Sequence, residues 1–269
     1  MEKLKKEIKS KRNFLCIGLD SDIDKLPTTF KRYKNPVFEF NKAVVEATQH
    51  LCVSYKLNTA FYESRGPQGW EDLERTAQII PPNLFTIADA KRGDIGNTAA
   101  QYAKAFFEQM SFDSLTVNPY MGLDTLDPYL AYDDKVVIVL ALTSNKGSAH
   151  FEMLPSDEQP LYEHVLKKVS EHAPTDSIQF VVGATHPEAL KGIRKIVPDN
   201  FLLVPGVGAQ GGDLKAVYAN GHNSDTGLLV NVSRGIIFAG NDSKDPIREI
   251  VKAAESYAAE MKALMSDGQ

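Results

Sequence analysis

Short hydrophobic runs alternate with longer amphipathic stretches along the whole chain. Eight of these runs have the length and the β-branched composition of strands. They lie at residues 14–19, 52–57, 84–88, 114–118, 136–142, 178–182, 201–204 and 228–232. Each run is apolar at consecutive positions, which predicts parallel strands that are covered on both faces.

Helical patterns occupy the stretches between these runs. The longest, at residues 246–264, repeats its apolar positions every three or four residues. Shorter helical patterns lie at residues 38–48, 98–109 and 161–171. The connections at 61–75 and 145–160 are too long for simple turns and predict extra loop or helix. This alternation predicts an α/β fold of the (β/α)8 TIM-barrel type. An open doubly wound sheet is the alternative, because periodicity does not reveal whether the first strand pairs with the last.

Composition is that of one globular domain, which we expect to span residues 1–269. Hydrophobic residues make up 43% of the chain and charged residues 24%. The net charge of -5 argues against nucleic acid as a partner, because a phosphate-backbone binder needs a basic surface. No stretch predicts a membrane span or a signal peptide, and the two cysteines fall in apolar runs. We therefore expect a cytoplasmic protein without a disulfide framework.

Charged residues follow the third predicted strand without a break. Asp89 and Lys91 are two positions apart, so on a strand both side chains would face the inside of the barrel at its carboxyl end. Lys56 ends the second apolar run, and Asp20 follows the first. Charges from three neighbouring strands predict an array of lysines and aspartates in which each group affects the ionisation of the next. A purely structural ion-pair network is the alternative.

A glycine-rich loop follows the seventh predicted strand. Gly206, Gly208 and Gly211 would let backbone N–H groups surround an anion, and barrels often bind phosphate after strands seven and eight. Arg234, just after the eighth strand, adds a guanidinium that can grip phosphate through two hydrogen bonds. The same glycines match a dinucleotide fingerprint, but they lie too late in the chain for it.

Smaller signals complete the candidate site. Ser144 follows the fifth strand, where it would hydrogen-bond a heterocycle or simply cap a turn. The six histidines have no metal-ligand spacing, so no metal site is expected.

Together these residues resemble the orotidine 5'-phosphate decarboxylase family, in its longer bacterial branch. The run Asp89-Ala90-Lys91-Arg92-Gly93-Asp94 is similar to that family's Asp-x-Lys-x-x-Asp signature. The resemblance extends from Leu15 to Ile236 and follows the family's order of site residues: Asp20, Lys56, Asp89, Lys91, Ser144, Pro205, Gln210 and Arg234.

The resemblance implies conversion of orotidine monophosphate to uridine monophosphate and carbon dioxide, without a cofactor. It implies that Lys91 delivers the proton that replaces carbon dioxide, and that Lys56 holds Asp89 and the ribose hydroxyls. It places Asp20 on the ribose and Ser144 on the pyrimidine. The resemblance also implies a set of residues that bind the rest of the nucleotide: Pro205, Gln210 and Arg234.

The resemblance also implies a homodimer with two composite sites. Asp94, Ile95 and Thr98 would then come from the partner subunit. Asn58, in an inserted segment, is either an extra contact or a structural residue. Three rivals are open: a metal-dependent phosphosugar decarboxylase of the same superfamily, a Schiff-base aldolase using Lys56 or Lys91, and a non-catalytic ligand-binding barrel.

Overall fold

All eight predicted runs form strands in the computed structural model, which describes residues 1–208, 211–241 and 243–267. The strands are β1 Leu15–Gly18, β2 Ser54–Asn58, β3 Phe85–Arg92, β4 Ser114–Val117, β5 Val136–Leu142, β8 Ile178–Val182, β9 Leu202–Pro205 and β10 Leu228–Val232. Four of them, β1, β4, β8 and β10, are buried along their whole length, as the continuous apolar runs predicted. β3 continues past its predicted end at residue 88 to Arg92, into the charged segment.

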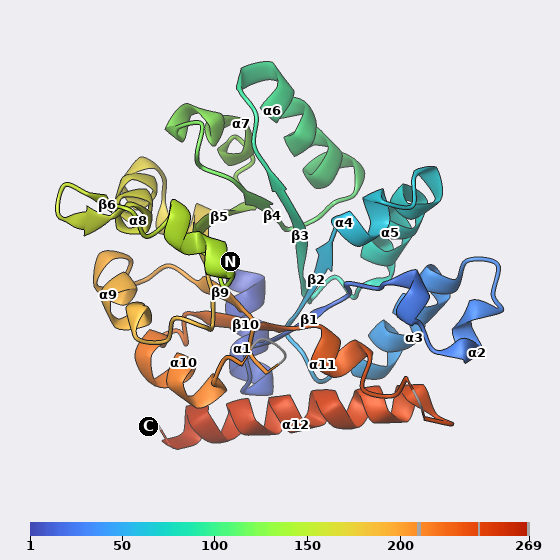
Figure 1. Ribbon diagram of the computed structural model, residues 1–269. Helices are drawn as coiled ribbons and strands as arrows, with labels where there is room; N and C mark the ends of the chain where they lie inside the picture. Colours follow the sequence, from blue (N-terminus) through green and yellow to red (C-terminus); the bar gives the residue numbers. More distant parts are fainter. Residues whose placement is uncertain (209–210, 242, 268–269) are drawn as a thin grey trace. The chain divides into compact units, whose positions relative to one another are not determined.

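These strands form one closed barrel in the order β1-β10-β9-β8-β5-β4-β3-β2 (Figure 1). Neighbours in the barrel are neighbours in sequence, and β10 returns to lie beside β1. The (β/α)8 barrel is therefore confirmed, and the open doubly wound sheet is excluded because it has two free edges.

The chain divides into two compact units. One comprises Met1, Lys91–Gln109 and Asp113–Val230, and the other comprises Glu2–Ala90, Met110–Phe112 and Asn231–Gln269.

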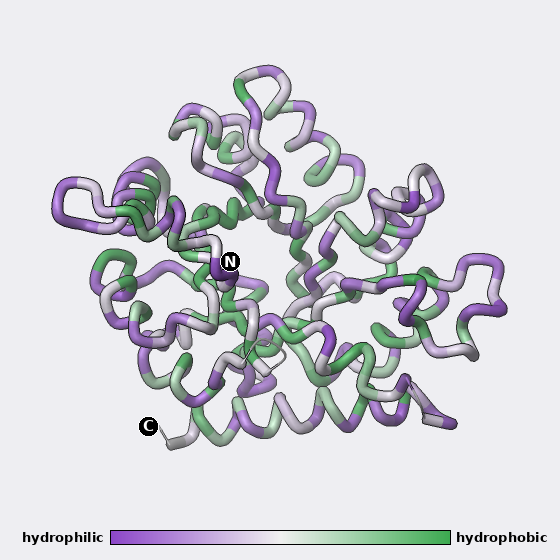
Figure 2. Tube along the Cα trace, viewed as in Figure 1, coloured by the Kyte–Doolittle hydropathy of each residue, from purple (hydrophilic) through white to green (hydrophobic). Residues whose placement is uncertain are grey.

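The second unit holds β1, β2 and β3, joined as parallel neighbours. Its helices are α1 Glu2–Lys11, α2 Thr28–Lys31, α3 Pro36–Thr48, α4 Ala60–Glu63, α5 Pro67–Ile79, α11 Arg234–Ile237 and α12 Pro246–Asp267. Helix α12 alternates between hydrophobic and hydrophilic residues along its length, as Figure 2 shows. Its predicted apolar stripe packs inward at Ile250, Ala254 and Met261, all fully buried. Helices α4 and α5 account for the long predicted connection after the second strand.

The first unit holds β4, β5, β8 and β9 with their own helices. These are α6 Gly96–Ala103, α7 Asp127–Leu130, α8 Leu161–His172, α9 Ala189–Ile196 and α10 Leu214–Gly221. The helix predicted at 98–109 is continuous but changes type, because Lys104–Gln109 forms π-helix. This wider turn accompanies the burial of two consecutive aromatic side chains, Phe106 and Phe107. The long predicted connection at 145–160 contains a short 3-10 helix, Lys146–His150, and the hairpin of β6 Pro155–Ser156 and β7 Gln159–Pro160.

Both cysteines, Cys16 and Cys52, are buried and free, as expected. Burial raises the pKa of each thiol to about 12, so both remain protonated and unreactive at neutral pH. No helix within the described ranges has the length and apolar character needed to cross a bilayer.

Candidate active site

Strand register brings three of the predicted charges together in the second unit. Gly18 of β1 and Ile87 of β3 are the partners of Lys56 on β2. Asp20 and Asp89 each lie two residues further along, hence on the same face and roughly 6–7 Å higher. A lysine side chain spans that distance, so Lys56 reaches up between the two carboxylates.

The resulting cluster of Asp20, Lys56 and Asp89 is a buried array of ion pairs. The Lys56 ammonium donates to Asp89 Oδ2 at 2.9 Å and to Asp20 Oδ1 at 3.2 Å. Only 3% of Lys56 and 9% of Asp89 are exposed. Burial alone would lower the pKa of Lys56, but the attraction of Asp20 and Asp89 outweighs it and raises that pKa above its ordinary value. Lys56 therefore remains a fixed cation at every physiological pH.

Buried hydrogen bonds hold the chain on both sides of Asp20. The Tyr62 hydroxyl donates to the Leu19 carbonyl at 2.9 Å, and the Ser21 hydroxyl donates to Asn41 Oδ1 at 2.5 Å. Asn41 in turn donates to Tyr62 at 2.9 Å. All of these supporting side chains are fully buried, so the position of Asp20 is set by α3 and α4 as well as by its own strand.

Lys91 departs from the regular strand alternation on which its predicted inward position rested. Its φ of 48° lies in the left-handed region, which breaks the alternation of an extended strand, and its side chain is exposed. The Lys91 N–H donates to the Thr116 hydroxyl at 2.8 Å within the first unit, which holds this unusual conformation in place. A non-glycine residue in this region costs roughly 1 kcal/mol or more, and such residues cluster at functional sites.

Asp94, Ile95 and Thr98 form a surface segment at the start of α6. Ile95 is 62% exposed, and Thr98 is also exposed. Asp94 Oδ1 accepts from the Ile95 N–H at 2.8 Å. The segment therefore presents a carboxylate, a large apolar side chain and a hydroxyl outward.

The glycine loop differs from the prediction that its N–H groups surround an anion. Gly206, Gly208 and Gly211 all have positive φ, which explains the requirement for glycine. However, the N–H groups of Gly208, Gly211 and Gly212 donate to carbonyls inside the loop. The prediction is therefore wrong for the N–H groups of Gly208 and Gly211, because the closed turn uses them in its own hydrogen bonds.

Two of the other residues predicted to bind the phosphate end lie at the ends of secondary-structure elements. Pro205 ends β9, and its carbonyl accepts from the Ala184 N–H at 2.9 Å. Arg234 begins α11 and is exposed. Gln210 lies outside the described residues.

Ser144 leaves the end of β5 within the first unit. Its carbonyl accepts from the Thr185 hydroxyl at 3.3 Å. The residue before it, Thr143, is bound by the carboxylate of Glu152, from the inserted segment. Sequence reasoning did not single out Glu152, since one acid in a polar loop carries no signal by itself.

Asn58 and Asn41 also gain a role from the structure. Asn58 Oδ1 accepts from the Ala60 N–H at 3.2 Å, which gives it a structural role at the start of α4. Asn41 was missed, although an amide within the apolar stripe of a helix is a signal that a buried polar network exists.

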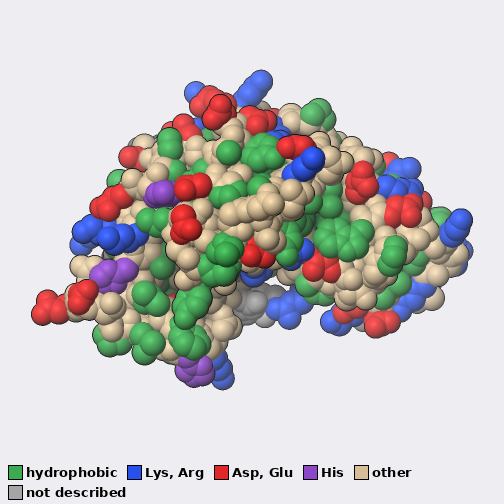
Figure 3. Space-filling view, turned by 90° about the horizontal axis from the view of Figure 1, so that it is seen from above, with side chains coloured by type: hydrophobic (Ala, Val, Ile, Leu, Met, Phe, Trp, Pro, Cys, Tyr) green, Lys and Arg blue, Asp and Glu red, His purple; other side chains and the backbone are tan. Residues whose placement is uncertain are grey.

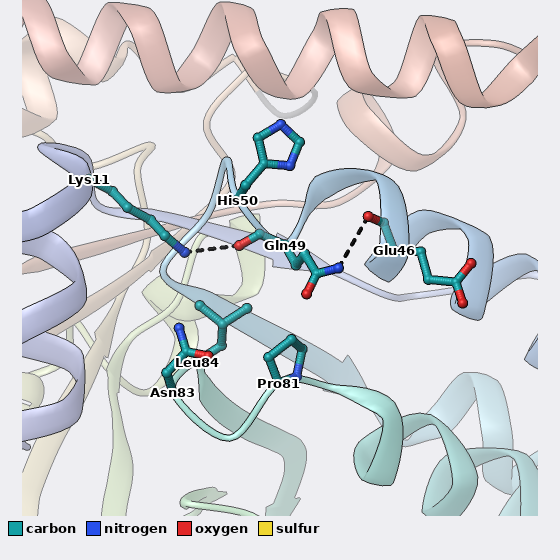
Figure 4. Close-up of a pocket in the computed structure, with 7 residues that line it drawn as sticks. All are labelled: Lys11, Glu46, Gln49, His50, Pro81, Asn83 and Leu84. Atoms are coloured by element: carbon teal, nitrogen blue, oxygen red, sulfur yellow. Dashed lines mark hydrogen bonds between the residues drawn. The ribbon is translucent and has the colours of Figure 1, made fainter.

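A hollow of about 360 Å³ lies in the second unit near the amino ends of β2 and β3. Figure 4 shows its lining, where the Lys11 ammonium points at the carbonyl of Gln49. Lys11 also donates to the Cys52 carbonyl and pairs with Glu7, so its three donors are occupied. Barrel enzymes build their sites at the other, carboxyl end of the strands, where Asp20, Lys56 and Asp89 lie.

Known proteins resemble this chain over nearly its whole length. The family model described as orotidine 5'-phosphate decarboxylase / HUMPS family matches residues 13–250. A protein from Christiangramia forsetii named orotidine 5'-phosphate decarboxylase is 51% identical over 245 residues, which are 90% of each chain. The structure of Leishmania donovani OMP decarboxylase is 36% identical, with a TM-score of 0.85 and 98% of both chains covered. Leishmania donovani UMP synthase is 37% identical with a TM-score of 0.87, but the chain spans only 56% of that longer protein.

Proposed function

Since the chain belongs to the orotidine 5'-phosphate decarboxylase / HUMPS family, we propose how its own residues convert orotidine monophosphate to uridine monophosphate and carbon dioxide. The activity is that of a carboxy-lyase of pyrimidine synthesis. The phosphosugar decarboxylase alternative is not supported, since the relative and the solved structures reported above carry the names of pyrimidine enzymes. The observation that carries the proposal is the buried array of Asp20, Lys56 and Asp89, followed two residues later by Lys91.

Decarboxylation leaves an electron pair on the pyrimidine carbon C6. The C6–carboxylate bond breaks, carbon dioxide departs, and the ring has no evident electron sink for the pair. A fixed ammonium about 4 Å away would stabilise this carbanion by roughly 4 kcal/mol at an effective dielectric near 20. We assign that task to Lys91, which then transfers a proton from Nζ to C6 and recovers one from water.

Asp89 and Lys56 prepare the charges around that step. In the proposal, Asp89 orients the Lys91 ammonium and keeps it protonated. Lys56 holds Asp89 and, with Asp20, contacts the ribose hydroxyls. The support for this is that Lys56 is buried between the two carboxylates at hydrogen-bonding distance. A buried carboxylate without such a cation would take up a proton and lose its charge.

The rest of the nucleotide is bound by residues further along the chain. Ser144 contacts the pyrimidine, while Pro205, Gln210 and Arg234 form the phosphate end. Arg234 supports this assignment because its exposed guanidinium can grip phosphate through two parallel hydrogen bonds. Binding energy from the remote phosphate aligns the ring, so loss of Arg234 would lower kcat as well as raise KM.

The experiment that tests the function is a direct assay on orotidine monophosphate. We expect the purified protein to lower the ultraviolet absorbance of orotidine monophosphate as it converts this substrate to uridine monophosphate. The rate should be the same with and without EDTA. Absence of conversion would refute the function. Loss of activity in EDTA would refute the cofactor-free mechanism and favour the metal-dependent rival.

We also propose that the protein is a homodimer in which Asp94, Ile95 and Thr98 complete the partner's site. The surface near them supports this, because the exposed large apolar residues of the first unit include Ile95 at 62%, Tyr120 at 83% and Met121 at 47%. An added Cβ on Gly93 would lie 3.3 Å from Met121, so the two exposed segments adjoin. Figure 3 shows how widely hydrophobic side chains reach the surface on one face of the molecule. Exposed apolar patches of this kind mark interfaces.

A shared site predicts complementation between two inactive variants. Lys91→Ala and Asp94→Asn should each be inactive alone, but co-refolded mixtures should recover about a quarter of wild-type activity, since half of the dimers are mixed and each has one intact site. Activity of the mixture against each variant refolded by itself is the measurement. If the mixture stays inactive although mixed dimers form, Asp94 does not act across an interface.

We place the protein in the cytoplasm, because two free buried thiols suit a reducing compartment.

We also propose that residues 1–269 act as one catalytic domain, since a (β/α)8 barrel needs all eight strands to close.

A further inference from the structure

The segment after β5 is held in one position by its own strand and by β8. The register of β5 against β8 shifts between Leu140 and Leu142, and an irregularity of this kind re-aims the side chains that follow. The Gly183 N–H then donates to the Leu142 carbonyl at 2.7 Å. A Cβ on Gly183 would come within 2.7 Å of the Ser144 backbone. The residue that follows β8 therefore packs directly against Ser144.

The inserted segment adds a separate restraint on the same turn. Glu152 Oε2 accepts from the Thr143 N–H at 2.7 Å. The Thr143 hydroxyl lies 2.8 Å from Glu152 Oε1 and 2.6 Å from Asn145 Oδ1, so its one proton is shared between these two acceptors. Both donors belong to the residue immediately before Ser144. Hydrogen bonds to an ionised acceptor are the strong ones, so this carboxylate fixes the Thr143 backbone firmly.

Glu152 is itself anchored to a helix. Its carbonyl accepts from the Tyr162 N–H at 2.8 Å, in the first turn of α8. The Leu161 N–H likewise donates to the Leu154 carbonyl at 2.9 Å. The inserted segment thus runs from Ser144 to the start of α8. Within it, the Glu152 carboxylate folds back and binds Thr143, at the end of β5.

We propose that Glu152 is a positioning residue that sets Ser144 for recognition of the pyrimidine base. The inference rests on the proposed contact between Ser144 and that base. The proposal gives the inserted segment at 145–160 a part in the specificity for the pyrimidine base. The base-binding end of the nucleotide should depend on Glu152, whereas the ribose and phosphate ends should not.

Three variants test this, with thermal unfolding measured for each. Glu152→Ala removes both acceptors, while Glu152→Gln keeps an amide oxygen for the Thr143 N–H and an amide N–H for its hydroxyl. Glu158→Ala is the matched control, since it removes an exposed acid from the hairpin of the same inserted segment. Affinity is measured by calorimetry for uridine monophosphate and for ribose 5-phosphate, which has no base.

We expect Glu152→Ala to weaken uridine monophosphate binding about tenfold and ribose 5-phosphate binding less than about twofold. Glu152→Gln should stay within about threefold of the wild type for both ligands, and Glu158→Ala should match the wild type. Equal losses for both ligands, unchanged uridine monophosphate binding in Glu152→Ala, or a Glu152→Gln defect as large as that of alanine would overturn the proposal. A wild-type protein that does not bind uridine monophosphate would instead refute the proposed function, and this inference with it.

Discussion

Lys91→Ala is expected to lower kcat by at least about 10⁴-fold, because it removes both the cation that stabilises the carbanion and the acid that protonates it. The protein should nevertheless fold normally. Lys91 is exposed, and Asp89 keeps its ion pair with Lys56 when Lys91 is removed, so no buried charge is left uncompensated. Alanine also has a Cβ, so the strain of the left-handed backbone is unchanged. Turnover of orotidine monophosphate and urea unfolding are the two measurements.

The control for Lys91→Ala is Lys104→Ala, which removes an exposed lysine from the same unit. It should change neither turnover nor stability. If Lys91→Ala lost several kcal/mol of stability, or kept more than about a tenth of wild-type activity, the assignment of Lys91 as the catalytic cation would fail. The result would then favour the alternative that the charged residues form a purely structural ion-pair network.

Lys56→Met is expected to affect stability and activity together. Lys56 is buried between Asp20 and Asp89, and removal of one partner from a buried ion pair typically costs about 3–5 kcal/mol. The loss of the array should also lower kcat/KM by roughly 10²-fold or more, since Asp89 could no longer be held as a charged group. Urea unfolding and steady-state kinetics test the two effects.

The stability loss in Lys56→Met should depend on pH in a definite direction. Without its cation, the buried Asp89 carboxyl would have a folded-state pKa above its unfolded value. The folded state then binds more protons, so stability falls as pH rises and recovers as pH is lowered. Lys42→Met is the control, because Lys42 pairs with Glu46 only at the surface and should cost less than about 1 kcal/mol. A pH-independent loss, or a loss no larger than the control's, would contradict the buried array.

The barrel was predictable because its signal is local and repeated. The strands are buried on both faces over most of their length, so a short apolar run marks each of them. The meeting of Asp20, Lys56 and Asp89 was also predictable, since parallel register alone puts residues two positions apart on a common face.

The rest of the site depends on interactions that have no local pattern. The conformation of Lys91 departs from strand alternation, and its N–H bonds Thr116, which is distant in sequence. The glycines after the seventh strand predicted N–H groups around an anion, but the N–H groups of Gly208 and Gly211 donate to carbonyls of the loop itself. Glu152 contacts Thr143 only because the inserted segment folds back on the end of β5. The hydrophobic periodicity of the sequence does not reveal such a contact within a loop.

Exchange of the C6 hydrogen of uridine monophosphate in D2O tests the central claim most directly. By microscopic reversibility, a site that stabilises the C6 carbanion during decarboxylation must also stabilise it when C6–H is ionised. Proton NMR should therefore show the wild-type protein replacing this hydrogen with deuterium, while Lys91→Ala binds the nucleotide without exchanging it. An intact C6–H signal with wild-type protein, or exchange that persists unchanged in Lys91→Ala, would contradict the account.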